Sequence, residues 1–539
     1  MPGKNREKGL TKWSDEEWLL RKTVDLAVLL LLGIFPLYYR NFYSDIMNVK
    51  YQFCYCTIIV MAVILLAIKA FFLVQTSPTG ERKNWKSVKA KDALKKMNAT
   101  EWFIMIFLVV AIISTFASDY FYEAFWGNEG RYSGLFLWLL YGVLFFAVAK
   151  LYIFKTWHLD IFLISGFLVC MLGILDYFLL DPLGFKVDIV PNHRDIFTST
   201  IGNVNSFSAF ALLYGGLAAA LFGMQEKRFS FLKNLLCMAT GFVALYTSRS
   251  DNAFLGLAAI FVCLPFVLSR TRHRRFRYLI ILAVFLTVGK GLQMINSQFP
   301  DRVIGMDSIS GTIVGLPYLG VIVIALWVII AVLYISGLTK AAMPEEKDKR
   351  AAKIWIGIWA VLIGAAVCGV LFAFYDINIR GNGEAYGKIG NYLLWNDDWG
   401  THRGFIWRIA IENYKDFSPL HKLFGYGLDT FGILTKQNNG YEMLNKYGEI
   451  YDSAHNGYLQ YLITVGPVGM LAYIGVLLSS LYLMVKKQKE NPYVMGIACA
   501  MAGYMAQATV NIDLPIVMPI FLLLMSMGVA ACRKEDRES

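Results

Sequence analysis

Long apolar runs alternate with short polar segments along nearly the whole chain, and this alternation predicts its fold. A run of about 18 to 25 mostly apolar residues is long enough to cross the hydrocarbon core of a bilayer as a helix. The runs lie at about residues 24–39, 53–74, 102–117, 134–154, 158–180, 200–223, 232–247, 253–269, 278–295, 313–338, 354–375, 457–485, 493–510 and 514–531. The sequence therefore predicts an all-α, polytopic integral membrane bundle of about 12 to 14 transmembrane helices.

Composition supports a membrane protein and excludes a soluble one. Of the 539 residues, 57% are hydrophobic and only 17% are charged, which is too apolar for a soluble domain of this size. Polar residues precede the first apolar run and no small-residue cleavage site follows it, so we interpret it as a retained span and not a signal peptide. Most of the eight cysteines fall inside apolar runs without metal-ligand spacing, so we expect neither a disulfide framework nor a metal site.

The distribution of Lys and Arg along the chain explains the net charge of +12. If the N-terminus is cytoplasmic, about two thirds of the 51 Lys and Arg residues fall in the loops on the cytoplasmic side. This bias predicts a multi-pass protein of the cytoplasmic (inner) membrane with both termini in the cytoplasm. Attraction to anionic membrane lipids accounts for the remaining excess, so no nucleic acid partner is implied.

The pattern divides the chain into five parts. They are a cytoplasmic N-terminus with two transmembrane helices and a basic segment (1–101), a transmembrane core (102–375), a large extracytoplasmic loop (376–456), C-terminal transmembrane helices (457–531) and a cytoplasmic tail (532–539). The basic segment Glu81–Met97 is either an amphipathic helix on the inner leaflet or a solvated linker.

Residues 376–456, the long loop from here on, form the largest hydrophilic insertion, and insertions of this length are usually functional. Arg403, Trp407, Ile411 and Tyr414 recur at helical spacing, which predicts a short helix at the bilayer surface that ends at Ser418-Pro419. The glycine-rich stretch 425–432 predicts a tight turn after that helix.

The long loop ends on a histidine that passes directly into an apolar helix. Asp452 or Ser453 is a plausible N-cap, which would put His455 in the first turn. The partial positive charge of a helix N-terminus disfavours imidazolium, so His455 would stay neutral, as a general base must. Gly466 and Gly469 lie further along, where a missing side chain lets another helix approach closely. A lone histidine at a membrane boundary can also be only a polar anchor.

Several ordered motifs resemble the O-antigen ligase and polymerase superfamily. His455-Asn456 followed by Gly466 and Gly469 resembles its signature. The others, in chain order, are WGNEGRYSGL (126–135), TSTIGNVNSFSAF (198–210), LYTSRSDNAFLGL (245–257) and the helix at 403–407 followed by Gly425-x-Gly427. The resemblance covers about residues 120–480 and leaves the N-terminal hundred residues unmatched. The family usually has about twelve spans, so either the first two spans are additions or some C-terminal pieces are re-entrant.

The resemblance implies a bacterial membrane glycosyltransferase that transfers or polymerises an undecaprenyl-diphosphate-linked oligosaccharide on the outer face of the cytoplasmic membrane. Its expected partners are that glycan donor, a glycan, lipid or protein acceptor, membrane lipids and a chain-length regulator. It implies metal-independent inverting transfer without a cofactor. Ligase, polymerase and protein O-oligosaccharyltransferase remain open as alternatives.

The resemblance also implies roles for individual residues. His455 would be the catalytic base, and Arg249 and Arg403 would bind the diphosphate. Arg249 occupies a short turn between two spans, where a permanent charge needs a partner, and its planar fork matches phosphate oxygens. Pairing with Asp251 is the structural alternative for Arg249. Further candidates are Arg131, Arg194, Asp452, Trp407 and Asn456.

Acidic residues and a different protein class complete the alternatives. Asp397-Asp398 could be a metal or base site, or simply a loop ahead of a helix. Asp513, between the last two spans, could be functional or could cap the final helix. A transporter or flippase of lipid-linked sugars would also have many spans. However, the inverted repeats and paired broken helices typical of such proteins are not recognisable in the sequence.

Overall fold

The computed structural model describes residues 14–74, 95, 97–187, 189–225, 228–306, 309–337 and 344–533. The predicted basic segment at 81–97 lies almost entirely outside the described residues. Helices dominate the described chain, and a single two-residue antiparallel pair, β1 (Phe197–Thr198) with β2 (Gly202–Asn203), is the only sheet in it. The all-α prediction is therefore confirmed.

A helix overlaps each of the fourteen predicted spans. They are α1 (Asp15–Leu29) continued by the π-helix η1 (Leu30–Ile34), α2 (Ile46–Val74), α4 (Ala99–Ala117), α6 (Leu135–Leu151), α7 (Thr156–Tyr177), α8 (Val204–Met224), α9 (Arg228–Thr247), α10 (Asn252–Val267), α11 (Arg272–Gln298), α13 (Leu319–Ile335), α14 (Glu345–Asn378), α19 (Gly457–Gln488), α20 (Pro492–Gln507) and α21 (Met518–Ala530). Among the described residues, nine helices are long and apolar enough to cross a membrane by length and composition, and four apolar helices are shorter. The chain is thus a polytopic membrane protein.

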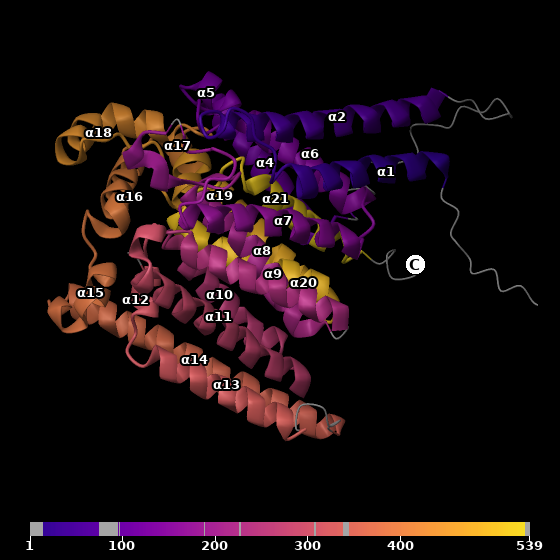
Figure 1. Cartoon of the computed structure of the whole chain (residues 1–539). Helices are drawn as coiled ribbons and strands as arrows, with labels where there is room; N and C mark the ends of the chain where they lie inside the picture. Colours follow the sequence, from indigo (N-terminus) through magenta and orange to yellow (C-terminus); the bar gives the residue numbers. More distant parts are fainter. Residues whose placement is uncertain are drawn as a thin grey trace, which may run out of the picture.

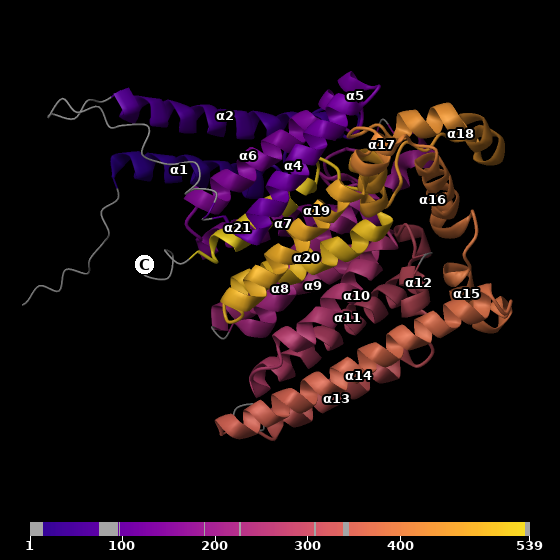
Figure 2. The same cartoon turned by 180° about the vertical axis from the view of Figure 1, so that it is seen from behind.

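The centre of the bundle is α8, whose sequence is rich in Gly and Ala. Small residues let helices approach closely in an apolar surrounding, where packing and not the hydrophobic effect joins them. Accordingly α8 is buried along its whole apolar window and packs on α9, α10 and α20, while α19 packs on α4 and α6 packs on α21. Figure 2 shows α8, α19 and α20 running side by side.

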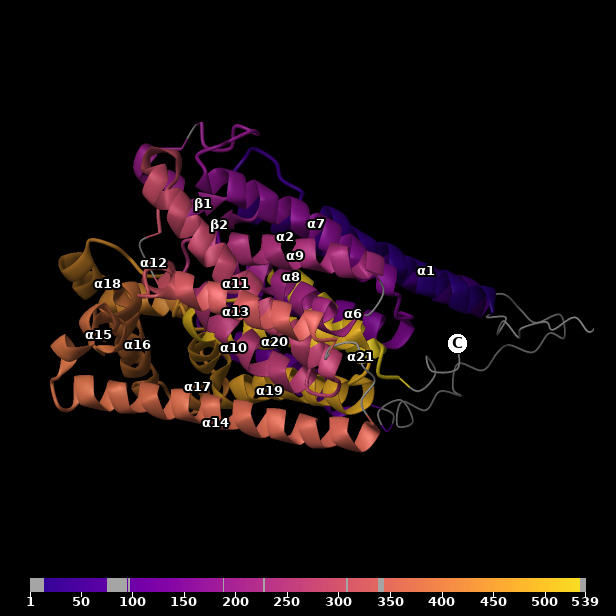
Figure 3. The same ribbon diagram turned by 60° about the horizontal axis from the view of Figure 1, so that its bottom comes forward.

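Two long helices lie at the side of this bundle. Helix α13 packs on α11 and α14 packs on α10, and α14 runs along the edge of the molecule (Figure 3). None of the most apolar window of α14 is buried inside the protein, so its Ile, Val and Phe side chains are exposed on the outside of the bundle, as expected for a surface that contacts lipid.

The long loop folds into short helices that gather at one end of the bundle, beside α5 (Phe121–Trp126) (Figure 1). These are η5 (Gly383–Tyr386), α15 (Gly387–Leu393), α16 (Trp399–Lys415), α17 (Pro419–Phe424) and α18 (Phe431–Tyr447). The remaining short elements are η3 (Pro191–Ile196), η4 (Pro300–Arg302), α12 (Ile309–Val314) and η6 (Ala508–Val510). Phe405, Ile406, Ile409, Phe431 and Met443 form a separate small core that holds α16 and α18 together.

The predicted helix at 403–414 is present as α16, but its buried face differs from the predicted stripe. Phe405, Ile406, Ile409 and Ala410 are buried, whereas Ile411 is exposed. The difference arises because α16 packs on α18 through its own core and does not simply lie on a flat surface.

Candidate functional site

His455 lies just before α19 and not in its first turn, so that part of the prediction is wrong. The N-cap is Asn456, whose side-chain oxygen accepts the backbone N–H groups of Tyr458 and Leu459, each at 3.1 Å. This amide oxygen satisfies the first donors of the helix, which leaves Asp452 and Ser453 free of the capping role. His455 itself has a left-handed backbone with φ of 46°. Asn456 therefore fixes the start of α19 directly after the histidine.

Gly466 of α19 allows another segment to approach closely, as predicted. The approaching segment is mainly the loop at Leu423 to Gly425, however, and not another helix. Gly466 has φ of 67° and breaks the helix ahead of Pro467. A Cβ on Gly466 would lie 2.2 Å from the carbonyl oxygen of Leu423, and one on Gly425 would lie 2.3 Å from the backbone of Thr464. The predicted turn after Gly425 thus docks on the break in α19, where the backbone N–H of Gly427 donates to the Thr464 carbonyl at 2.9 Å.

Two neighbours hold the histidine loop in place. The indole Nε1 of Trp407 donates to the carbonyl oxygen of Ala454 at 2.9 Å, and the backbone N–H of Ala454 donates to Gln460 Oε1 at 2.9 Å. Nδ1 of His455 lies 3.1 Å from Ser453 Oγ and 3.3 Å from the Ser453 carbonyl oxygen. A proton on Nδ1 can be donated to that carbonyl, which leaves Nε2 with its lone pair as a proton acceptor.

The surroundings of His455 keep it neutral. Burial lowers its pKa to about 4, and the positive charges of Arg403 and Arg131 act in the same direction. Hydrogen bonding to the Ser453 backbone and the charge of Asp452 oppose this shift only in part. Neutral imidazole is the form that can accept a proton, and the sequence predicted this state for a different reason, the helix N-terminus.

Arg403 is a half-buried cation, and it has no carboxylate within ion-pair distance in the part of the chain that the structure describes. Burial lowers the pKa of its guanidinium, and the nearby charge of Asp251 raises it in part. Its Nη1 donates to the carbonyl oxygen of Gly400 at 2.5 Å, while its Nε is buried without a hydrogen-bond acceptor. A half-buried guanidinium that Asp251 compensates only in part, beside a neutral histidine, is suited to bind an anion.

Arg249 lies in the turn between α9 and α10 with a left-handed φ of 56°. Its Nη1 forms an ion pair with Asp195 at 3.0 Å and not with Asp251, the partner considered from the sequence. Asp251 accepts instead from the backbone N–H of Ile309 at 2.9 Å and is close enough to Arg403 to influence its pKa. The structure therefore brings the turn of Arg249 toward Arg403.

The remaining predicted arginines differ from each other. Arg131 forms a bidentate ion pair with Asp452. Burial raises the pKa of Asp452, but the hydrogen bond and the charge of Arg131 more than offset this effect, so the pKa stays below its usual range. Arg194 donates to the carbonyl oxygens of Ile189 and Val187 in its own loop, at 3.0 and 3.5 Å. Arg131 thus belongs to the His455 group, and no described contact joins Arg194 to it.

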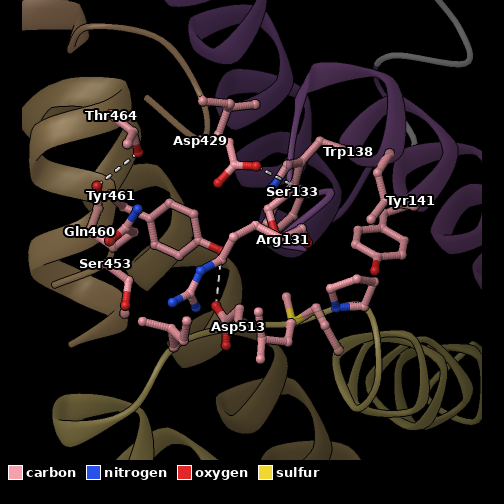
Figure 4. A pocket seen from close by; sticks show the side chains of 17 residues that line it. Arg131, Ser133, Trp138, Tyr141, Asp429, Ser453, Gln460, Tyr461, Thr464 and Asp513 are labelled. Atoms are coloured by element: carbon pink, nitrogen blue, oxygen red, sulfur yellow. Dashed lines mark hydrogen bonds between the residues drawn. The ribbon is translucent and has the colours of Figure 1, made fainter. Parts of the chain in front are cut away.

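A cavity of about 40 Å³ lies next to Arg131 and Ser453, the neighbours of the histidine (Figure 4). Arg131, Asp429, Ser453 and Asp513 contribute its polar lining, together with Tyr461. Figure 4 shows Arg131 between Asp429 and the Asp513 side of this cavity.

Two acidic residues of the cavity have clear partners. Asp513 accepts hydrogen bonds from the hydroxyls of Tyr461 and Tyr473 at 2.9 Å and of Tyr504 at 2.8 Å, so it does not cap α21, which begins only at Met518. Asp429 accepts from the backbone N–H of Asn128 at 2.7 Å and of Ser133 at 3.2 Å, and burial raises its pKa to about 7. Sequence reasoning missed Asp429, although a polar residue inside the glycine-rich turn was a usable signal.

Residues 118–134, the first loop from here on, are joined to the long loop by side-chain hydrogen bonds and an ion pair. These are Tyr426 to Asp119 (2.5 Å), Tyr120 to Gln437 (2.5 Å), Asp429 to Asn128 and Ser133, and Arg131 to Asp452. Two segments far apart in the sequence therefore build one site.

Asp397 and Asp398 do not act as a pair. Asp397 binds Arg408 at 3.2 Å and Lys446 at 2.6 Å, while Asp398 accepts from the Tyr447 hydroxyl at 2.8 Å. Among the described residues, no group of three or more His, Cys, Asp or Glu side chains could hold a metal ion.

The bundle and its site define a polytopic membrane protein with a neutral proton acceptor beside cations that can bind an anionic substrate group. A family model described as O-antigen ligase matches residues 303–474, a range that includes Arg403, Trp407, Asp452, His455 and Asn456. This match over about a third of the chain supports the predicted superfamily and a glycosyltransferase-like function in glycan ligation. Such a function involves a lipid-linked glycan donor and an acceptor. No curated protein matches the chain.

Proposed function

We propose that this protein transfers an undecaprenyl-diphosphate-linked glycan to a glycan acceptor by an inverting, metal-independent reaction at His455. The observation that carries the proposal is the half-buried Arg403, whose buried Nε has no hydrogen-bond acceptor among the described residues and which lies beside a histidine kept neutral by its surroundings. The bias of Lys and Arg toward alternate loops supports a site on the outer face of the cytoplasmic membrane.

In the proposed reaction, Nε2 of His455 takes the proton from an acceptor hydroxyl as its oxygen attacks the anomeric carbon of the donor. The new carbon–oxygen bond forms on the face opposite the departing group, so the configuration inverts. The bond from the anomeric carbon to the diphosphate breaks, and the diphosphate leaves with the electron pair. Arg403 and Arg249 stabilise its developing charge through planar, bidentate hydrogen bonds.

The Arg131–Asp452 ion pair has a positioning role in this scheme. Asp452 lies three residues before His455, and Arg131 belongs to the first loop. The pair therefore fixes the histidine loop against the first loop, and its positive member helps to keep His455 neutral.

Substitution of His455 tests the proposal. His455→Gln and His455→Ala should both reduce glycan transfer by roughly 10²- to 10⁴-fold, the usual contribution of a positioned base. An amide can hold a hydrogen bond but cannot take up a proton, so Gln should not rescue Ala. The assay is transfer from lipid-linked glycan donor by purified protein in proteoliposomes.

His402 offers a matched control within the same loop. Its Nδ1 lies 2.7 Å from the Tyr451 hydroxyl and its ring stacks on Tyr447. His402→Gln should retain transfer within about threefold of wild type. Near wild-type transfer by His455→Gln would refute the role of His455 as base.

A further inference from the structure

A second, larger cleft lies on the long loop beside the histidine. Its volume is about 620 Å³, within the range of small-molecule sites. Two indole rings, Trp395 and Trp407, line it with their centroids 5.6 Å apart, and Trp399 packs behind them at 5.1 and 5.3 Å. Trp395 is 45% exposed, so an aromatic surface remains open toward the cleft.

Two aliphatic side chains, Ile411 and Leu459, also line the cleft, together with four charged side chains whose charges balance. Asp397 and Glu412 contribute two carboxylates, and Arg408 and Lys415 contribute two cations. Arg408 is occupied by ion pairs to Asp397, Glu412 and Glu442 at 2.7 to 3.2 Å. The carboxylates keep further lone pairs, so the cleft presents hydrogen-bond acceptors without a net charge that would attract a phosphate.

The cleft ends next to the catalytic group. Asn456 and Gly404 both line it, and they directly follow His455 and Arg403 in the chain. Trp407 joins the two regions, since its indole N–H holds the carbonyl of Ala454. A molecule in the cleft would therefore have one end within reach of the site.

We propose that this cleft binds the sugar rings of a saccharide chain. The C–H faces of sugar rings pack on indole surfaces, and their hydroxyls donate to carboxylates, which together match an uncharged polyol. An acyl chain could pack on the indoles, Ile411 and Leu459, but it would take water from the four charged side chains of the same lining without replacing its hydrogen bonds. The inference rests on the proposed function, because only a saccharide that reacts at His455 needs a binding surface there.

Photocrosslinking in intact cells tests the ligand class directly. Benzoylphenylalanine at Lys415, which lines the cleft, should give an adduct that periodate degrades as carbohydrate. The same residue at Tyr441, 83% exposed on α18 and outside the cleft lining, should give at least tenfold less. A lipid or peptide adduct at Lys415, or no excess over Tyr441, would overturn the proposal.

Kinetics of Trp395 variants distinguish donor from acceptor saccharide. Trp395→Ala should raise KM for one of the two substrates by roughly three- to tenfold, more than it lowers kcat, and Trp395→Phe should restore most of it. The substrate whose KM rises is the one that occupies the cleft. Unchanged KM values for both would contradict the proposal.

A crosslinking experiment with His455→Gln separates this inference from the proposed function. Saccharide adducts at Lys415 should persist in that variant while transfer is lost. If His455→Gln transfers normally but the adducts remain, the base assignment fails and the cleft stands. If transfer is lost and the wild-type protein gives no saccharide adduct, the cleft assignment fails and the base stands.

Discussion

The low pKa of His455 predicts an unusual pH profile for transfer. A histidine with a pKa of about 4 is roughly 90% neutral at pH 5, whereas one with the ordinary value of about 6.5 is roughly 3% neutral. Between pH 8 and pH 5, kcat/KM should therefore fall by less than about twofold, compared with about thirtyfold for an unperturbed base. Below pH 4 it should fall about tenfold per pH unit, because imidazolium cannot accept a proton.

The assay is the initial transfer rate at donor concentrations well below KM, because kcat/KM reports the free enzyme. The donor diphosphate is esterified at both ends, so it lacks the second phosphate ionisation near about pH 6. Asp429 titrates in this range with a pKa of about 7, so the profile is repeated in Asp429→Asn, which keeps an acceptor for the two backbone N–H groups. A kinetic pKa near 6.5 in both proteins would refute the reasoning.

Removing the charge that helps to depress the pKa gives a second arm of the same prediction. Arg403→Gln lowers transfer but should leave a measurable rate, and in this residual rate the acidic limb should move upward from pH 4 toward 6.5. If the acidic limb of the pH profile stays at the same pH in Arg403→Gln, then the charge of Arg403 does not contribute to the low pKa of His455.

Two further substitutions examine the diphosphate site and the loop contact. Arg249→Lys should lose most transfer because Lys presents a point charge, whereas Asp195→Asn, which removes one ion-pair partner of Arg249, should retain it. Equal effects of the two substitutions in the transfer assay would favour an anchoring role for Arg249. Gly466→Ala adds a Cβ 2.2 Å from a carbonyl oxygen at φ of 67°, so its thermal unfolding temperature in detergent should lie well below that of the wild type. Gly357→Ala is the control, because open space surrounds Gly357, and its unfolding temperature should match that of the wild type.

The sequence was sufficient for the parts of the structure that depend on local composition. Apolar run length placed a helix at each of the fourteen predicted runs, since a membrane span needs little more than length and hydrophobicity. The glycine-rich turn and the end of α16 before Ser418 also follow from local chemistry. The sequence did not predict contacts between residues that are far apart in the chain. Examples are the ion pair of Arg249 with Asp195 and the three tyrosine hydroxyls that donate to Asp513.

The histidine shows the same limit at one residue. From the sequence, Asp452 and Ser453 are plausible N-caps of α19, but Asn456, three residues after Ser453, has a similar capping propensity, and propensity alone does not separate the three. The choice of Asn456 becomes clear only because Asp452 is taken by Arg131, more than three hundred residues earlier in the chain. The sequence also predicted a neutral His455. The structure agrees, but the cause is burial together with the charges of Arg403 and Arg131, and not the helix N-terminus.

The hydrogen bonds and ion pair between the first loop and the long loop have a practical consequence for protein engineering. A chimera that grafts the long loop from a relative brings in new partners for Asp119, Asn128 and Arg131 and leaves these three groups unmatched. An exchange of the long loop should therefore move both loops as one module. Libraries for altered glycan preference should likewise diversify the two segments together.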